Sequence, residues 1–262
     1  MKRAPQHAHA VFLYTASLAS VLLFVLVVCF LTRTHVVPFA QKHELVPIVR
    51  LYALTDVDAA MWLGEYYFTS ANYDSERAEH YYRRANALDP SLALAHYQLG
   101  RIAFIRGRFT EAQSHIDASL RYDPSYYRGY YMRGLIAGYE KDYKKAADAF
   151  YIFLQYDSIG WAGYNDLSWI YFQQGNFPAA EEIAVFGLGY APENAWLHNS
   201  VGVAQLAQGK KAQARVHFKR ALERLDQMTP DDWGIAYPGN DPTIYTEGLE
   251  SMRQSIVHNL AQ

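Results

Sequence analysis

Histidines are the first candidates for chemistry in this sequence, because an imidazole can act as an acid, a base or a metal ligand. His7 and His9 stand in a short polar tail, and His96 and His198 occupy equivalent places in a 34-residue repeat. Recurrence at a fixed place in a repeat is typical of a packing position. A catalytic site needs a nucleophile, a base or a metal set that converges in space. We therefore expect these histidines to be structural.

Aspartates near the C-terminus are the second candidates. Asp231, Asp232 and Asp241 could gather on one loop and bind a divalent cation. Their spacing lacks the alternating ligands and the bidentate glutamate of an EF-hand. The sequence also contains no P-loop, dinucleotide fingerprint, nucleophile elbow or metalloprotease motif. We therefore predict that the protein is not an enzyme and has neither a metal site nor a cofactor.

Composition excludes further classes of function. The 262 residues carry a formal charge of −2, which gives no reason to expect nucleic acid as a partner. Half of the chain is hydrophobic (51%) and 22 residues are tyrosine, so wholesale disorder is excluded. Cys29 is the single cysteine, which excludes an intramolecular disulfide framework and a cysteine-based zinc site.

Residues 10–32 form an uncharged run of 23 residues, AVFLYTASLASVLLFVLVVCFLT. As a helix this run would span roughly 35 Å, enough for a hydrocarbon core of about 30 Å. The apolar region of a cleaved signal peptide is shorter, about 7–15 residues, and ends at a small-residue cleavage site. We therefore predict a polar tail over residues 1–9 and an uncleaved transmembrane anchor over residues 10–32, which inserts into a lipid bilayer.

The charges that flank the anchor bear on its orientation. Lys2 and Arg3 favour an N-terminus in the cytoplasm, whereas Arg33 and Lys42 on the other side weaken this bias. We predict a single-pass membrane protein whose large domain lies on the non-cytoplasmic side, in the bacterial periplasm or at the cell exterior.

A 34-residue period fills the middle of the chain. Alanines recur in one column at steps of 34 residues, and small residues recur in a second column whose first step is 36 and whose later steps are 34, because two extra residues stand between Gly64 and Ala78. The first column is Ala78, Ala112, Ala146, Ala180 and Ala214, and the second is Gly64, Gly100, Gly134, Ser168 and Gly202. A fixed period of this length indicates a solenoid of stacked supersecondary units.

Each unit has the pattern of two antiparallel helices. In the second unit, large apolar residues recur at helical spacing over residues 92–105, Gly107 breaks the pattern, and a partner helix follows over residues 109–120. The small columns fall where two helices cross and a larger side chain would force them apart. The sequence therefore predicts an all-α fold with about five helix pairs over residues 57–226.

These repeats resemble the tetratricopeptide repeat family. The first unit carries the family signature in Trp62-Leu63-Gly64 with Tyr67, Ala78, Tyr82, Ala85 and Pro90, and the later units repeat it. Departures occur at Arg133, Ala184 and Ser158, which stand where the family has an apolar residue, a large residue and a proline. The resemblance implies a right-handed α-solenoid in which the first helix of each unit lines a concave groove.

The segments on either side of the repeats have patterns of their own. Residues 33–56 form a juxtamembrane connector, whose apolar residues 44–55 predict a short helix packed on the first unit. Residues 227–262 contain an irregular segment and a final helix, whose apolar face is formed by Tyr245, Leu249, Met252, Ile256 and Leu260. Repeat arrays need a terminal cap with a polar outer face, and this helix fits that role. The irregular segment around Trp233 either belongs to the cap, which we favour, or folds back towards the groove.

Candidate binding residues lie on the first helices of the units, where residues three and four apart share a face. The columns along the implied groove are aromatic and apolar, with a few polar points and little charge. The predicted peptide-binding residues are Tyr97, Arg101, Arg128, Tyr131, Asn165, Trp169, Trp196 and Asn199.

Asn165 and Asn199 are the most informative members of this set. An asparagine amide both donates and accepts, so successive asparagines can pair with the backbone of an extended peptide. Such ladders occur in relatives that bind peptides without strong sequence preference. The alternative is that both asparagines bond within the array.

Three interpretations of function follow. The favoured one is a membrane-anchored scaffold or assembly factor that holds an extended protein segment in its groove beside a membrane complex. The second is a permanent structural subunit that docks on a membrane or envelope complex through its outer surfaces. The third is a cytoplasmic-facing adaptor, as in a family of similar layout that ends in a cysteine-rich metal module. The lack of any cysteine after Cys29 counts against membership of that family.

Overall fold

The computed structural model describes residues 33–262, so the predicted polar tail and the anchor over residues 10–32 lie outside the described part. Within residues 33–262, no helix is both long enough and apolar enough to cross a bilayer. The described chain is helical from residue 33 onwards and contains no strand.

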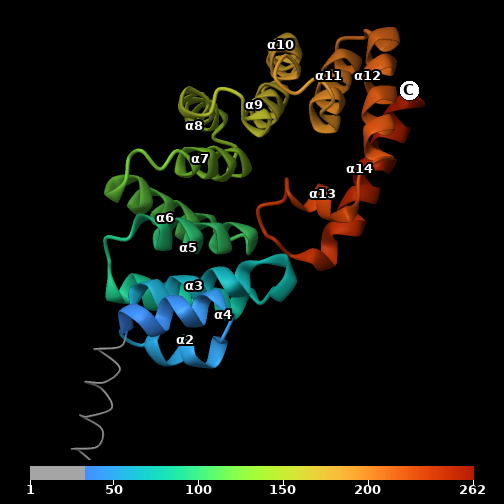
Figure 1. Cartoon of the computed structure of the whole chain (residues 1–262). Helices are drawn as coiled ribbons and strands as arrows, with labels where there is room; N and C mark the ends of the chain where they lie inside the picture. The colour runs from blue at the N-terminus through green and yellow to red at the C-terminus, as the bar shows by residue number, and fades with distance from the viewer. Residues whose placement is uncertain (1–32) are drawn as a thin grey trace, which may run out of the picture.

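Five antiparallel helix pairs follow one another in a curved array, as the 34-residue period predicts (Figure 1). The first helices are α3 (Val57–Phe68), α5 (Ala93–Ile105), α7 (Arg128–Tyr139), α9 (Trp161–Gln173) and α11 (Ala195–Ala207). Their partners are α4 (Ser75–Leu88), α6 (Phe109–Tyr122), α8 (Tyr143–Tyr156), α10 (Phe177–Leu188) and α12 (Lys211–Leu225). The first helices line the inner side of the curve, and the second helices form the outer side (Figure 1).

The turns between paired helices show why the sequence breaks where it does. Gly107, Gly175 and Gly209 adopt positive φ angles of 69°, 74° and 77°, a region that glycine enters without steric cost. The third unit places Lys141 at the same point, with φ of 64°. Several helices then begin with a side-chain cap, as where Asp74 accepts from the backbone N–H of Arg77 at 2.9 Å.

The small-residue column lies where the paired helices cross. A Cβ atom added at Gly64 would lie 2.4 Å from the ring of Tyr82, and one at Gly134 would lie 2.7 Å from the ring of Phe150. In the fourth unit the column holds Ser168, whose hydroxyl is buried and donates to the carbonyl oxygen of Ala180 at 2.8 Å. The column is small because a large partner side chain already fills each crossing.

The flanking helices cover both ends of the array. The predicted connector helix is α2 (Val46–Tyr52), and its residues Val49 and Tyr52 are buried in the core cluster of the first unit. At the other end α14 (Tyr245–Leu260) packs against α12, with Leu249 and Ile256 buried beside Phe218. The final helix therefore covers the last unit, as a cap would.

The segment between α12 and α14 is more ordered than the predicted irregular loop. It contains α13 (Pro230–Gly234), whose first turn has a reciprocal cap between Thr229 and Asp232, and a 3-10 turn, η2 (Pro242–Ile244). Trp233 packs on the cap, with its ring centroid 6.2 Å from that of Tyr245. Tyr237 still packs on the cap, with its ring centroid 5.7 Å from that of Trp233, and the residues after it cross the inside of the curve towards α3 and α5 (Figure 1). The interpretation of the whole segment as part of the cap is therefore wrong for this stretch.

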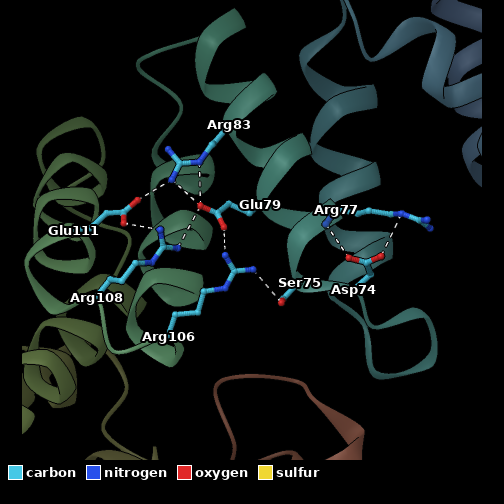
Figure 2. Close-up of polar contacts among 8 residues, drawn as sticks. All are labelled: Asp74, Ser75, Arg77, Glu79, Arg83, Arg106, Arg108 and Glu111. Atoms are coloured by element: carbon cyan, nitrogen blue, oxygen red, sulfur yellow. Dashed lines mark hydrogen bonds and ion pairs between the residues drawn. The ribbon is translucent and has the colours of Figure 1, made fainter.

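An ionic cluster joins the first two units on the outer side (Figure 2). The carboxylate of Glu79 on α4 accepts from Arg83 at 2.6 Å and from Arg108 at 3.3 Å, and it also pairs with Arg106. Glu111 on α6 pairs with Arg83 and Arg108 at 2.8 Å each. Burial alone would raise the pKa of Glu79, but the three arginines outweigh it and lower the pKa.

We expect Glu79→Gln to lower the free energy of unfolding by about 1–2 kcal/mol, because it leaves three arginines together without their shared anion. The loss should shrink as salt is added, since the cluster is partly exposed. Urea unfolding at low and high NaCl measures both effects. Glu76→Gln, an exposed position on the same helix, is the matched control and should change little. A salt-independent loss would contradict this account of the cluster.

Candidate functional site

The inner surface formed by α3, α5, α7, α9 and α11 is called the groove from here on. Its N-terminal half holds a cavity of about 370 Å³ between these helices and the segment that precedes η2. Four of the eight predicted site residues line this cavity, namely Tyr97, Arg101, Arg128 and Tyr131. Residues from Ile235 to Asn240 form the opposite wall. The segment thus covers part of the N-terminal half of the groove, and the cavity beneath it remains open to solvent on one side.

Arg101 holds the C-terminal segment in the groove. Its guanidinium donates to the carbonyl oxygen of Pro238 at 2.7 Å and lies 3.4 Å from the amide oxygen of Asn240. The same guanidinium lies over the ring of Phe68, 4.8 Å from the centroid. The amide nitrogen of Asn240 donates to the backbone carbonyl of Phe68 at 2.8 Å. The sequence left two alternatives for the region around Trp233, namely packing in the cap or folding back towards the groove. These contacts show that the segment folds back onto the groove.

The C-terminal half of the groove is free of that segment. A cavity of about 160 Å³ lies between α9 and α11, and Trp169, Phe172, Asn199 and Val203 are among the residues that line it. The amide oxygen of Asn199 is buried and has no hydrogen-bond partner within residues 33–262. An unpaired buried acceptor costs free energy until a donor reaches it. Asn199 thus brings an amide with an unsatisfied acceptor to the wall of this cavity.

Asn165 differs from Asn199 because its amide is already satisfied. Its nitrogen donates to Asp166 at 3.0 Å, and its oxygen accepts from the hydroxyl of Ser200 at 2.8 Å. The other carboxylate oxygen of Asp166 accepts from the hydroxyl of Tyr131 at 2.6 Å. The chain Tyr131–Asp166–Asn165–Ser200 links α7, α9 and α11. For Asn165, the alternative of bonding within the array holds.

Trp196 lines neither of these two cavities and packs on another tryptophan. Its ring stacks on that of Trp161, with centroids 5.0 Å apart and planes at 27°. Trp161 in turn lines the N-terminal cavity, whereas Trp169 lines the C-terminal one. The structure therefore divides the predicted residues among two cavities, a tryptophan pair and the polar chain that contains Asn165, instead of arranging them along one continuous channel.

Asp166 is a groove residue that the sequence did not single out. The only available signal was a charged residue beside Asn165 in an otherwise apolar helix, WAGYNDLSW. Burial raises the pKa of Asp166 to about 6, against hydrogen bonds from Tyr131 and Asn165 that lower it. The usual pKa of an aspartate side chain is 3.8.

This raised pKa predicts a pH dependence of stability. Between pH 4 and pH 6 the folded state binds the proton of Asp166 more tightly than the unfolded state, so stability falls as the pH rises through this window. At pH 8 the charged carboxylate should cost about 2 kcal/mol relative to pH 4. The stability difference between the wild type and Asp166→Asn, measured by urea unfolding at pH 4 and pH 8, checks this. The exposed Asp148→Asn is the control. A difference that does not vary with pH would contradict the assignment.

The histidines form two equivalent pairs, one in the second unit and one in the fifth. The Nδ1 atoms of His96 and His115 lie 3.2 Å apart, and those of His198 and His217 lie 3.0 Å apart. The Nε2 of His96 donates to the carbonyl oxygen of Pro90, and that of His198 to the carbonyl oxygen of Pro192. Each pair joins the two helices of its unit. The expected structural role of His96 and His198 is confirmed.

The aspartates near the C-terminus serve the local backbone. Asp232 belongs to the cap of α13, and Asp241 accepts from the backbone N–H and the hydroxyl of Thr243. Within the described part of the chain, no three His, Cys, Asp or Glu side chains lie close enough together to hold a metal ion.

Comparisons with known proteins agree with this architecture. The family model of the tetratricopeptide repeat matches residues 70–112, 97–158 and 165–232, more than half of the chain. A comparison with curated proteins found no match.

Several solved structures share the fold. PilW, described as a widely conserved type IV pilus biogenesis factor, is 19% identical over 77% of this chain and 98% of its own, with a TM-score of 0.60. PilF of Pseudomonas aeruginosa is 18% identical over 78% of this chain and 90% of its own, with a TM-score of 0.58. YrrB, described as having an unusual peptide-binding site, is 18% identical over 65% of this chain and 87% of its own, with a TM-score of 0.53. At these identities the likeness shows the fold alone.

Proposed function

Because the chain belongs to the tetratricopeptide repeat family, we propose that it is a scaffold that holds an extended segment of a partner protein in its groove. The observation that carries the proposal is the amide of Asn199, which lies in the wall of the cavity beside Trp169 and whose oxygen is buried and unpaired. A backbone N–H of an extended peptide is a donor of the right kind for this oxygen. Trp169 supplies a rigid aromatic surface of the type that dominates protein interfaces.

The finer proposal places this scaffold at a membrane. Residues 10–32 would anchor it, and the repeats would then hold the partner segment beside a membrane complex on the non-cytoplasmic side. The partner is a protein and not a nucleic acid, and the proposal assigns the chain no catalytic activity. The peptide-binding site named for YrrB and the assembly role named for PilW are in keeping with such a function.

A second candidate is a structural subunit that docks through the outer side. It is favoured by Val185, Phe186 and Tyr190 on and just after α10, which are 47%, 56% and 47% exposed. Exposed apolar side chains that cluster on one surface mark interaction sites in many proteins.

The two candidates are distinguished by matched variants of the full-length protein. Each variant is recovered from membranes with a reversible cross-linker, and the captured proteins are identified by mass spectrometry. Asn199→Ala should capture about tenfold less partner than the wild type, because it leaves a donor on the partner unpaired. Val185→Ala should capture as much partner as the wild type. The opposite pattern would reject the groove and support the docked subunit.

A further inference from the structure

The N-terminal half of the groove contains a site that is built independently of the segment lying in it. Arg101 is fixed from below by Gln98, which accepts from it at 2.9 Å and itself donates to Glu65 at 2.5 Å. The rings of Phe68 and Tyr97 lie under the guanidinium, with centroids at 4.8 Å and 5.9 Å. An arginine oriented in this way presents its remaining N–H groups to the groove without needing the segment.

The segment satisfies this site with two groups at a fixed spacing. The carbonyl oxygen of Pro238 accepts from Arg101, and the side-chain amide of Asn240, two residues later, donates to the carbonyl of Phe68. Pro238 has no N–H of its own to satisfy. The site thus binds a main-chain carbonyl oxygen and, two residues later in the same segment, a side-chain amide.

The segment is fixed in the groove at few points, through Pro238 and Asn240, while Tyr237 stacks on Trp233 of the cap with ring centroids 5.7 Å apart. Ile235 is 82% exposed, and a cavity of about 370 Å³ remains between the segment and the helices. The elements on either side of it are secured elsewhere, since Trp233 packs on the cap and Leu249 and Ile256 are buried against α12. The segment can therefore leave the groove while α14 stays in place.

We propose that the site formed by Phe68, Tyr97 and Arg101 is a recognition site for a turn-forming protein segment with this carbonyl–amide pattern, which residues 237–240 fill in the free protein. A partner segment of the same chemistry displaces the internal one and gains access to the cavity beneath. This inference depends on the proposed function in one respect, namely that a partner protein binds in the groove. The site and the internal segment that fills it are part of the structure itself.

The extent to which the internal segment weakens binding of a competing peptide can be calculated. A short tether gives an effective concentration in the mM range. A site with a Kd of about 0.1 mM for the free segment would then be filled by the internal segment about ten times more often than it is empty, and a competing peptide would bind about tenfold more weakly than to the emptied site.

The test uses the full-length chain and a fluorescent peptide of residues 234–242, GIAYPGNDP, in an anisotropy titration. Replacing residues 235–240 with six Gly and Ser residues should tighten binding of the peptide about tenfold relative to the wild type. Asn240→Ala, which removes one internal contact and keeps the loop, should shift binding in the same direction. Adding Arg101→Gln to the loop-replaced chain should abolish binding.

Equal peptide binding by the wild type and both opened variants would overturn the proposal, as would full binding to the Arg101→Gln chain. Thermal unfolding of each variant confirms that the repeats remain folded. The proposed function is read separately, by partner capture with Asn199→Ala. Peptide binding that follows the expected pattern without any partner at Asn199 would reject the proposed function and leave this site standing.

Discussion

Replacing Phe150 with alanine is expected to lower the free energy of unfolding by about 3–5 kcal/mol. Phe150 is fully buried in the third unit, in the middle of the array. Its ring fills the space over Gly134, where even a Cβ atom would lie 2.7 Å away, and it packs edge-on against Tyr131. Glycine has no side chain that could move into the vacated volume, so the cavity should persist.

The position of Phe150 gives a second expected result. Each unit of a repeat array is stabilised chiefly by its neighbours. A large loss in the central unit should therefore separate unfolding of the two ends, and the urea transition followed by circular dichroism should broaden or split.

Phe186→Ala is the matched control for this prediction, because the residue is 56% exposed on an outer helix. It should cost less than about 1 kcal/mol. Equal losses in the two variants would show that the crossing between Gly134 and Phe150 is not the packing centre of its unit.

The helix pairs and their crossings could be predicted from the sequence because the contacts that make them are local and periodic. Gly100, Gly134 and Gly202 recur in phase, and each faces a large side chain of its own unit, so one pattern describes these crossings. The final helix could also be predicted, because Leu249 and Ile256 share one apolar face. The last unit of a repeat array is exposed at its end and needs such a helix to cover it.

The C-terminal segment could not be placed from the sequence with the same reasoning. Its contacts join residues far apart in the chain, 137 residues for Arg101 with Pro238 and 172 residues for Phe68 with Asn240. Neither pair belongs to a periodic column. The mixture of proline, glycine and asparagine in this stretch predicts turns but says nothing about which surface the turns reach.

The sequence predicts the candidate site as columns of equivalent residues along the repeats. Residues in one column can nevertheless have different hydrogen-bond partners. Asn165 and Asn199 are equivalent in the repeat, yet Asp166 and Ser200 occupy the amide of Asn165 while the oxygen of Asn199 is left unpaired. Tyr97 is only 7% exposed, because Tyr126 packs against it with centroids 4.9 Å apart. A helix-face argument places a residue on the groove side, but the neighbours of that residue decide whether its polar atoms are free.

The central claim is that the C-terminal half of the groove holds the partner. Phe172 lines the cavity that contains Trp169 and Asn199, whereas Phe186 is exposed on the outer side of the neighbouring helix. Both are phenylalanines on adjacent helices of one unit, so each can be replaced by the photo-reactive p-benzoylphenylalanine with a similar change in size. The cross-linker forms a covalent bond only with atoms that it contacts.

The most direct measurement is therefore photo-cross-linking of the full-length protein in its native membranes from these two positions. We expect irradiation to join a partner protein to the chain from position 172 and not from position 186, and Asn199→Ala to reduce the product from position 172 by about tenfold. A partner joined from position 186 alone would contradict the account and place the interaction on the outer side.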